Sequence, residues 1–442
     1  MDPITHGLTG ALIGKAFFAG RPSLRNGARR AALDEEGSEL PPEPTATRSG
    51  ASRAATWICV LAALFPDIDI LFDPFVPNEM FTIELHRGVT HSLVCLPVFA
   101  IALAAGTRWW LDWRARRKLQ SSGQAAESRL SWRMLTAIWA VGIASHILLD
   151  LATSWGTMVW APLSNARVSW DLVFIIDFTL TAILVAPQVL AWIYRRRPGV
   201  RPRSIGARRR AAAMWVVFSL CALGVGVLLR GFGLPLSPWT MPVVIIILGA
   251  VLFAPLLRGW GFALSRTAWC RAGVLALAGY YAVCALAHQR ALSSVRQFAV
   301  AQRVQVEAIG ALPMPPSHVY WQGLIRTPDG AYRSYFAAGH NPGPHFEFIA
   351  DQKLPAHVAQ ALDAQPEVRI WRWFARFPIV RHREQAGEHI VDLLDLRFFS
   401  LNSVVPAAFQ YRVVVSAQGE VVRHGWVETL DTEDARADDE ND

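Results

Sequence analysis

The sequence of 442 residues contains few cysteines and few charges. Its five cysteines lie between Cys59 and Cys284, and no C-x-x-C pair of the metal-binding or redox type occurs. We therefore expect buried structural thiols, and the cysteine-free remainder is compatible with an oxidising compartment. Charged residues make up only 18% of the chain, below the ~25% that is usual for soluble domains. This composition predicts that lipid is part of the protein's solvent.

Acidic residues are absent from a long internal stretch, because no Asp or Glu occurs between Asp177 and Glu307. Histidine is absent from a similar stretch, between His146 and His288. The helices expected within 211–288 therefore carry no carboxylate, and we interpret them as scaffold. The polar groups that could perform chemistry in a membrane lie in the first 180 residues.

Long apolar runs predict the fold class. A run of about 20 residues can cross a hydrocarbon core of ~30 Å. The N-terminus predicts one more helix, with Asp2 as its N-cap and Pro3 at its first position, which spans the membrane or re-enters it. We expect an all-α polytopic membrane protein with about 7–8 transmembrane helices and a C-terminal α+β extramembrane domain. The predicted spans are 53–73, 92–112, 134–155, 172–194, 211–233 and 268–288, with a weaker one at 240–257.

The net charge of +8 comes largely from two short loops, 113–118 and 194–210. Basic loops between spans face the cytoplasm, so we interpret this charge as a topology signal and expect no nucleic acid partner. Counting spans outward puts 74–91 and 156–171 on the opposite side, together with the chain after 288. The C-terminal domain is therefore predicted to be extracytoplasmic.

Composition divides the chain into parts. Residues 1–190 form a helical membrane domain in which 21–52 is a flexible cytoplasmic loop. Accessory helices occupy 191–290, an α+β domain 291–430, and an acidic disordered tail 431–442. Within the α+β domain, "HVYWQGLIRT-PDG-AYRSYFAA" and "FQYRVVVS-AQGE-VVRHGWV" predict two hairpins. "AHVAQAL" and "EVRIWRWFARF" predict helices, and "HIVDLLDLRFF" predicts a strand.

The stretch "HRGVTH" (86–91) stands directly before an apolar run. Gly88 permits a tight turn, so His86 and His91 could converge on one ion. Thr90 could cap the following span. Arg87 could hold a phosphate, or equally a lipid headgroup. By itself this stretch could be an ordinary membrane interface.

Further candidate ligands stand at other span ends. His146 and Asp150 are four residues apart and therefore lie on one helix face. There they could bind one metal ion together, or simply form a hydrogen bond with each other. Asp67 and Asp69 in "FPDIDIL" would point in different directions on a regular helix. Pro66 favours a break in the helix that could turn both side chains inward. A span end at which both acids are simply solvated is equally compatible with the sequence. The predicted topology carries all of these to the non-cytoplasmic face, with His6, Asp171 and Asp177. Imidazole and carboxylate donors suit Zn²⁺, Mn²⁺ or Fe²⁺.

Four motifs in this order, "MDPITHGLTGALIG", "FPDIDIL", "HRGVTHSL" and "ASHILLDLATSWGT", resemble the bacterial membrane-bound metal-dependent hydrolases of the YdjM/YbcI type over residues 1–180. The family is distantly similar to zinc-dependent phospholipase C. The resemblance implies an inner-membrane location and a divalent metal, most readily zinc, with one to three ions. It implies catalytic roles for Asp69, Asp150, Arg87 and Thr90. Its implied metal ligands are His6, Asp67, Asp69, His86, His91, His146 and Asp150.

Three functions compete. The favoured one is hydrolysis of a phosphoester, such as a phospholipid or another lipid-linked phosphate, by metal-activated water at the extracytoplasmic membrane face. A metal transporter or sensor would need polar groups on a route across the membrane. A metal-stabilised scaffold would display the C-terminal domain without turnover. Membrane lipid is the expected partner, and the oligomeric state stays open.

Overall fold

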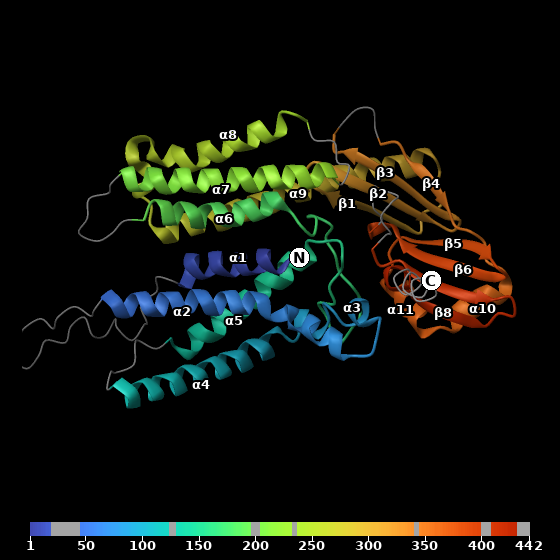
Figure 1. The fold of residues 1–442 in the computed structure, drawn as a ribbon, viewed down its shortest axis with the longest axis horizontal. Helices are drawn as coiled ribbons and strands as arrows, with labels where there is room; N and C mark the ends of the chain where they lie inside the picture. The colour runs from blue at the N-terminus through green and yellow to red at the C-terminus, as the bar shows by residue number, and fades with distance from the viewer. Residues whose placement is uncertain are drawn as a thin grey trace, which may run out of the picture. The chain divides into compact units, whose positions relative to one another are not determined.

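The computed structural model describes residues 1–18, 45–122, 130–195, 204–231, 237–339, 344–398 and 408–430. The chain forms two compact units. The first comprises 1–66, 93–148 and 179–280, and it is helical. The second comprises 67–92, 149–178 and 281–442, and it contains all the described strands. Figure 1 traces the elements along the chain.

The first unit begins with α1 (Pro3–Ile13), which continues as a π-helical turn, Gly14–Phe18. The Asp2 carboxylate accepts a hydrogen bond from the Thr5 amide at 2.9 Å, which confirms Asp2 as the N-cap. Pro3 is the first residue of the helix, as predicted. α2 (Thr45–Leu64) packs on α1. Because α2 starts at Thr45, the end of the predicted loop 21–52 is helical. Residues 21–44 lie outside the described part of the chain.

The remaining helices of this unit are apolar and differ in length. α7 (Ser204–Gly231) packs on α8 (Thr240–Phe253), and the Trp215 indole donates to the Ile245 carbonyl at 2.9 Å. A 3₁₀ segment, Ala254–Phe262, follows α8 and is kinked at Leu257–Gly259. The other helices are α4 (Leu96–Ser122), α5 (Trp132–Leu151), α6 (Phe178–Ile193) and α9 (Arg266–Ala301).

Fewer helices can cross a membrane than the 7–8 predicted. Among the described residues, five are long and apolar enough, or six if Phe81–His91 and Leu96–Arg117 form one broken span. α6 has only 16 residues, about 24 Å at ~1.5 Å per residue, because the chain before Phe178 is irregular. α1 has 11 residues. Apolar composition predicted a span at 172–194, but the hydrogen-bonded length of α6 is short for one. For α1 it predicted a helix that either spans or re-enters the membrane, and this stays a prediction, because the chain between Phe18 and Thr45 lies outside the described residues.

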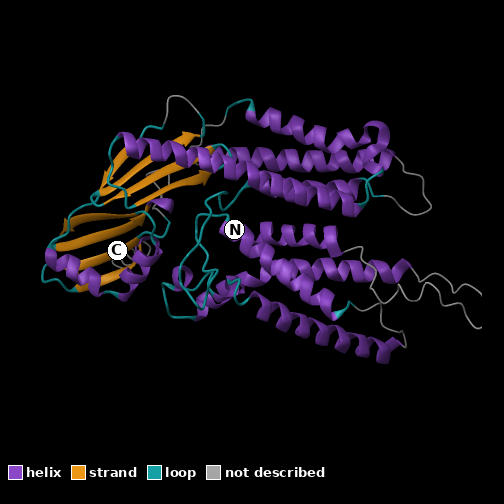
Figure 2. Cartoon of the chain, turned by 180° about the vertical axis from the view of Figure 1, so that it is seen from behind, coloured by secondary structure: helices purple, strands orange, loops and turns teal. Residues whose placement is uncertain are grey.

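The second unit contains two four-stranded antiparallel sheets in sequential order. The first is β1 (Ala308–Met314), β2 (Tyr320–Thr327), β3 (Gly330–Ala337) and β4 (Glu347–Ala350). The second is β5 (Pro378–Gln385), β6 (Glu388–Asp395), β7 (Tyr411–Ser416) and β8 (Val421–Trp426). α10 (Ala356–Ala364) and α11 (Pro366–Phe374) lie between the sheets in sequence. The predicted hairpins, helices and strand are confirmed, as Figure 2 shows.

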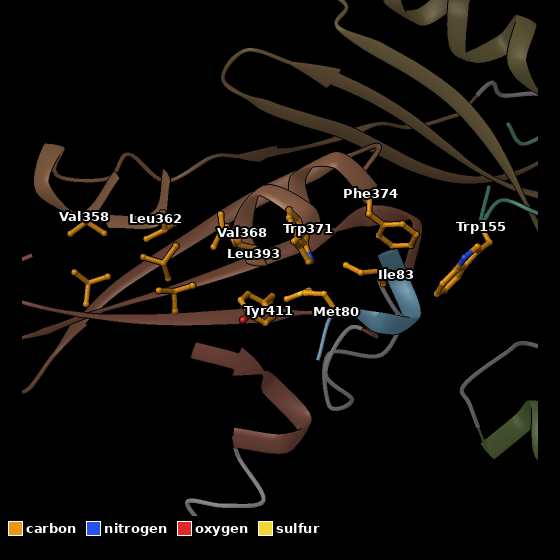
Figure 3. Packing of buried hydrophobic residues seen from close by; sticks show 13 residues of the cluster. Met80, Ile83, Trp155, Val358, Leu362, Val368, Trp371, Phe374, Leu393 and Tyr411 are labelled. Carbon is orange, nitrogen blue, oxygen red and sulfur yellow. The ribbon is translucent and has the colours of Figure 1, made fainter. Parts of the chain in front are cut away.

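Two hydrophobic clusters of the second unit include residues from outside its sheets. The last turns of α9 place Ala291 and Val295 against Trp321 of the first sheet. The second sheet and α11 form another core, into which α3 (Phe81–Glu84) inserts Ile83, with Met80 just before it (Figure 3). The chain segment that precedes "HRGVTH" is therefore anchored in the C-terminal core.

The cysteines form no disulfide among the described residues. Cys59, Cys270 and Cys284 are buried, as predicted, whereas Cys221 is exposed and Cys95 is intermediate. Exposure of Cys221 follows from the position of α7, whose apolar face has little protein packed against it.

A candidate metal site beside a cavity

His91 is the centre of a polar cluster within the second unit. Its ring is fully buried. The Nε2 atom lies 3.4 Å from Asp67 Oδ1 and 3.3 Å from Asp150 Oδ2. The Nδ1 atom lies 3.5 Å from Asp69 Oδ2. Three carboxylates from two separate segments therefore surround one imidazole.

The break after α2 explains how both acids of "FPDIDIL" reach this ring. The α-helix ends at Leu64, and a 3₁₀ helix follows from Phe65 to Phe75. Asp67 and Asp69 still diverge on this turn, but they contact opposite nitrogens of His91. The sequence left open whether a break at Pro66 turns both acids inward or the span simply ends in solvent, and the structure provides the break and brings both acids to His91.

"HRGVTH" forms a turn followed by a short 3₁₀ helix, Val89–His91. The left-handed residue is Arg87, with φ 61°, whereas Gly88 has φ −91°. Gly88 is needed for space instead, because an added Cβ would lie 2.8 Å from the Leu85 carbonyl oxygen. The Met158 amide donates to the Arg87 carbonyl at 2.9 Å and fixes the turn.

Thr90 does not cap the following helix as predicted, because α4 begins only at Leu96. Its hydroxyl donates to Asp69 Oδ2 at 2.9 Å and lies 3.0 Å from His91 Nδ1. The other oxygen of Asp69 lies 3.1 Å from His86 Nδ1. Asp69 thus joins both histidines of the "HRGVTH" turn, and Asp69, His86 and His91 form one potential metal-binding group.

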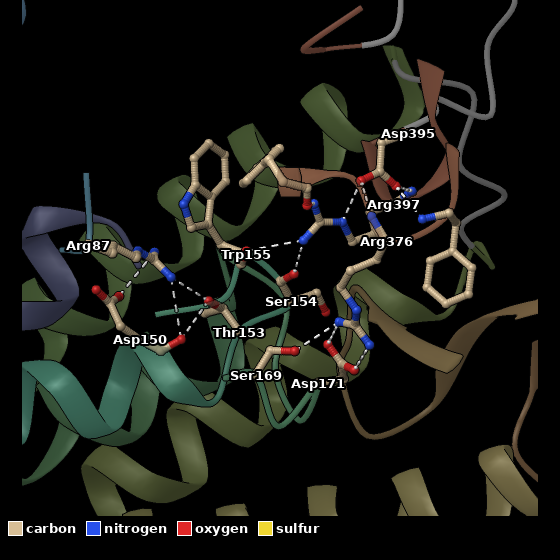
Figure 4. A network of polar contacts seen from close by, with 12 residues as sticks. Arg87, Asp150, Thr153, Ser154, Trp155, Ser169, Asp171, Arg376, Asp395 and Arg397 are labelled. Atoms are coloured by element: carbon tan, nitrogen blue, oxygen red, sulfur yellow. Dashed lines mark hydrogen bonds and ion pairs between the residues drawn. The ribbon is translucent and has the colours of Figure 1, made fainter. Parts of the chain in front are cut away.

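Arg87 is buried and points into the cluster (Figure 4). Its guanidinium lies 3.1 Å from Asp150 Oδ1 and donates to Thr153 Oγ1 at 2.9 Å. It also lies 5.9 Å from the centre of the Trp155 ring, within cation–π range. The guanidinium therefore neutralises and orients Asp150, a role different from the predicted contact with phosphate or lipid headgroup.

The turn also rests on a second buried arginine, Arg167. Its guanidinium donates to the His86 carbonyl at 3.2 Å and to the Gly156 carbonyl at 3.1 Å. Burial, and then the nearby charges of Arg397 and Arg87, lower the pKa of Arg167 to about 9. At neutral pH it remains a cation and holds the backbone around His86 and Gly156.

α5 brings a further imidazole, one turn before Asp150. His146 is fully buried, and its Nδ1 lies 2.7 Å from the Ala63 carbonyl oxygen. A carbonyl can only accept, so Nδ1 carries the proton and Nε2 is the nitrogen that would coordinate a metal. Asp67, His91 and Asp150, all in the second unit, belong to the second potential metal-binding group, and His146 lies one turn before Asp150 on α5. His6 stacks on His146 with ring centres 3.6 Å apart and lies in neither group.

The two weaker candidates lie elsewhere. Asp171 forms a bidentate pair with Arg376, at 2.9 Å for each bond. Burial opposes the charge of Arg376, but the hydrogen bonds and charge of Asp171 outweigh it and raise the pKa of Arg376. Asp177 accepts from the Ser317 hydroxyl. Both acids bind the loop after α5 to the C-terminal region and are not part of either metal-binding group among the described residues.

A cavity of about 770 Å³ adjoins the cluster, within the second unit. Asp69 and Thr90 belong both to its wall and to the cluster. α11 also lines the cavity, through Arg369 and Trp373. The rest of the lining is mostly apolar, with a few polar side chains: Glu84, Leu85, Gly88, Val89, Met158, Ala161, Pro162, Ser164, Asn165, Pro366 and Ile370.

The donor set fits a divalent metal. With neutral imidazoles, the three carboxylates and the Arg87 guanidinium leave two negative charges in a buried cluster. Such charge is costly without a cation. The contacts of His91 Nε2 with Asp67 and Asp150, at 3.4 and 3.3 Å, are long for hydrogen bonds. They match the separation of about 3.3 Å between ligands of a tetrahedral ion with bonds of ~2.0 Å.

Sequence reasoning missed Thr153, Trp155 and the cavity wall on α11. Thr153 has a usable signal, because it stands three residues after Asp150 in "HILLDLAT" and its hydroxyl accepts from Arg87. Arg369 has no such signal in the sequence, because exposed arginines are common on amphipathic helices. Only the tertiary structure makes it part of the cavity.

Comparison with known proteins identifies the region that contains the cluster. Residues 1–233 match the family model described as "YdjM inner membrane protein", which covers more than half of the chain. No curated protein and no solved structure matches the chain.

Proposed function

We propose that this chain, which belongs to the YdjM inner membrane protein family, is a metal-dependent hydrolase of a phosphoester at the extracytoplasmic membrane face. The observation that carries the proposal is the buried ring of His91, surrounded by three carboxylates beside a cavity. A structural site would need the ligands alone, whereas an enzyme also needs space for substrate next to them.

The residues that would hold the metal are those that converge on His91. In the second unit, Asp67, His91 and Asp150 would form one set, and Asp69 and His86 would extend it toward a second ion. His146, one helical turn before Asp150 on α5, stays a predicted further ligand. Zn²⁺ is the best match for mixed imidazole and carboxylate donors, with Mn²⁺ or Fe²⁺ as alternatives. When bound, such an ion supplies a Lewis acid and lowers the pKa of water, so that water can attack at neutral pH.

Asp69 is the best candidate for general base. It reaches the cavity, whereas Asp150 is fully buried and bound to Arg87. The hydroxyl of Thr90 and the ring of His86 hold the two oxygens of Asp69 in place. Arg87 would act as a positioning residue through Asp150.

The cavity supports an amphipathic substrate. Its volume is within the ~300–1,000 Å³ of small-molecule sites. Leu85, Val89 and Trp373 offer an apolar surface, and Arg369 offers a cation for a phosphate. A phospholipid headgroup with the start of its acyl chains, or another lipid-linked phosphate, has this combination.

The test uses the full chain purified in detergent, stripped by a chelator and reloaded with Zn²⁺ or Mn²⁺. Bis(4-nitrophenyl) phosphate, 4-nitrophenyl phosphate and phosphatidylglycerol vesicles serve as probes. We expect metal-dependent release of nitrophenol or headgroup, reduced at least roughly a hundredfold in His91→Ala. The control is Arg108→Ala, which removes the partly exposed pair with Asp112 and a hydrogen bond to the Leu130 carbonyl, neither of which involves the cluster.

Two results would refute hydrolysis. Tight metal binding that stabilises the chain without turnover of any probe would favour the metal-stabilised scaffold. Accumulation of metal inside proteoliposomes would favour transport. Absence of bound metal after reloading would contradict all three functions.

A further inference from the structure

A second cluster of imidazoles lies on the second sheet and shares no residue with the site around His91. His382 and Glu384 are two residues apart on β5, so their side chains project from the same face. His389 on β6 is directly opposite Glu384 in the antiparallel register. Neighbouring positions on one sheet face thus bring three potential ligands together.

The distances within this cluster fit shared coordination. His389 Nδ1 lies 3.1 Å from His382 Nε2 and 3.2 Å from Glu384 Oε1. All three potential ligand atoms lie within 4.8 Å of one another. A single ring nitrogen that faces both another imidazole nitrogen and a carboxylate oxygen has the spacing of about 3.3 Å expected between ligands of one tetrahedral ion.

His357 on α10 completes the arrangement. Its Nε2 lies 3.2 Å from His389 Nε2, on the side of the ring opposite Nδ1. A histidine that binds a metal through one nitrogen usually donates the other N–H to an acceptor, which fixes the tautomer. His357 is in the position of that acceptor and would leave the Nδ1 lone pair of His389 for the metal.

Burial differs across the cluster in a way that leaves one side open. His389 is only 7% exposed, whereas the Glu384 side chain is 67% exposed. Three protein donors leave at least one coordination position of a tetrahedral ion for water or an external ligand. An ion bound here would be exchangeable.

We propose that His382, Glu384 and His389 form a second, solvent-facing site for a divalent transition metal such as Zn²⁺, with His357 orienting His389. The site is independent of the proposed hydrolysis, because its ligands all come from the second β-sheet. It would bind borderline metals in preference to Mg²⁺ or Ca²⁺, which favour all-oxygen ligands.

Equilibrium dialysis of the detergent-purified full chain against Zn²⁺ tests the site by counting bound equivalents. We expect Glu384→Gln and His389→Ala each to lose one equivalent relative to wild type. His357→Ala should keep the site but bind Zn²⁺ about 10–100-fold more weakly, as is typical when a partner of a ligating histidine is removed. Excess Mg²⁺ should not displace this equivalent.

The matched controls are Glu388→Gln, an acid on the same hairpin outside the cluster, and His345→Ala, an exposed histidine in the same region. Both should bind as many equivalents as wild type. Because the Glu384 side chain is largely exposed, Glu384→Gln should fold normally, and its unfolding midpoint in chelator verifies this. Unchanged stoichiometry in folded Glu384→Gln, or an equal loss in His345→Ala, would overturn the proposal.

Discussion

Asp69 connects the proposed metal site to the cavity. Its two oxygens contact different partners, the His86 ring and the Thr90 hydroxyl. Asp150 has the opposite environment, fully buried and bound to a buried arginine. Two carboxylates of one cluster therefore differ in their access to water, which is the usual basis for giving them different chemical roles.

The hydrogen bond from Thr90 to Asp69 gives a test at this scale. Thr90→Val keeps the shape of the side chain and removes the donor, so Asp69 should be held less firmly. We expect Zn²⁺ affinity, measured by competition with a fluorescent chelator, to fall about 10–100-fold. Thr90→Ser retains the hydroxyl and should bind nearly as wild type. Equal affinity of the valine and serine variants would show that this contact is unimportant.

At the scale of elements, breaks in regular structure position the cluster. The 3₁₀ helix after α2 presents Asp67 and Asp69, and the turn at Arg87 presents His86 and His91. α5 remains regular through Asp150 and ends at Leu151. The i to i+4 spacing of His146 and Asp150 was therefore readable from sequence, whereas the convergence of the two acids in "FPDIDIL" depended on the fold.

Close packing of α5 on α2 sets the position of this helix. An added Cβ at Gly142 would lie 2.4 Å from the Ala62 Cβ, closer than atoms can approach. Gly142→Ala should therefore lower the free energy of unfolding by about 1–3 kcal/mol, because the helices must separate. The measurement is denaturant unfolding in detergent micelles.

The matched control for that substitution is Gly106→Ala in α4. An added Cβ there meets nothing within 4 Å, so the variant should gain roughly 0.5–1 kcal/mol from the lower flexibility of alanine. Equal stability of the two variants would contradict the tight α2–α5 packing.

At the scale of the whole molecule, the C-terminal sheets are tied to the loop that follows α5. Arg397 pairs with Asp395 at 2.8 Å and donates to the carbonyls of Ser154 and Trp155, at 3.1 Å each. Arg376 holds Asp171 in the same loop. This loop begins at Ala152, two residues after Asp150, and α11 lines the cavity. The C-terminal region is thus part of the site's framework.

Membrane orientation is the remaining prediction at this scale. Lys353→Cys, on an exposed position of the C-terminal region, should react with a membrane-impermeant maleimide added to intact spheroplasts. Arg116→Cys, in the basic segment at the end of α4, should react only after permeabilisation. The unsubstituted chain measures the background of the native cysteines. The reverse pattern of labelling would place the C-terminal region in the cytoplasm.

The sequence by itself determined the helical membrane character, the Asp2 cap and the two C-terminal hairpins, because each depends on hydrophobic runs or on hydrogen bonds between near neighbours. It also singled out the histidines and acids. Only the structure showed that α6 is short for a span and that Arg87 binds Asp150. The pairing of His91 with three carboxylates joins residues up to 59 positions apart, and no local pattern specifies such contacts.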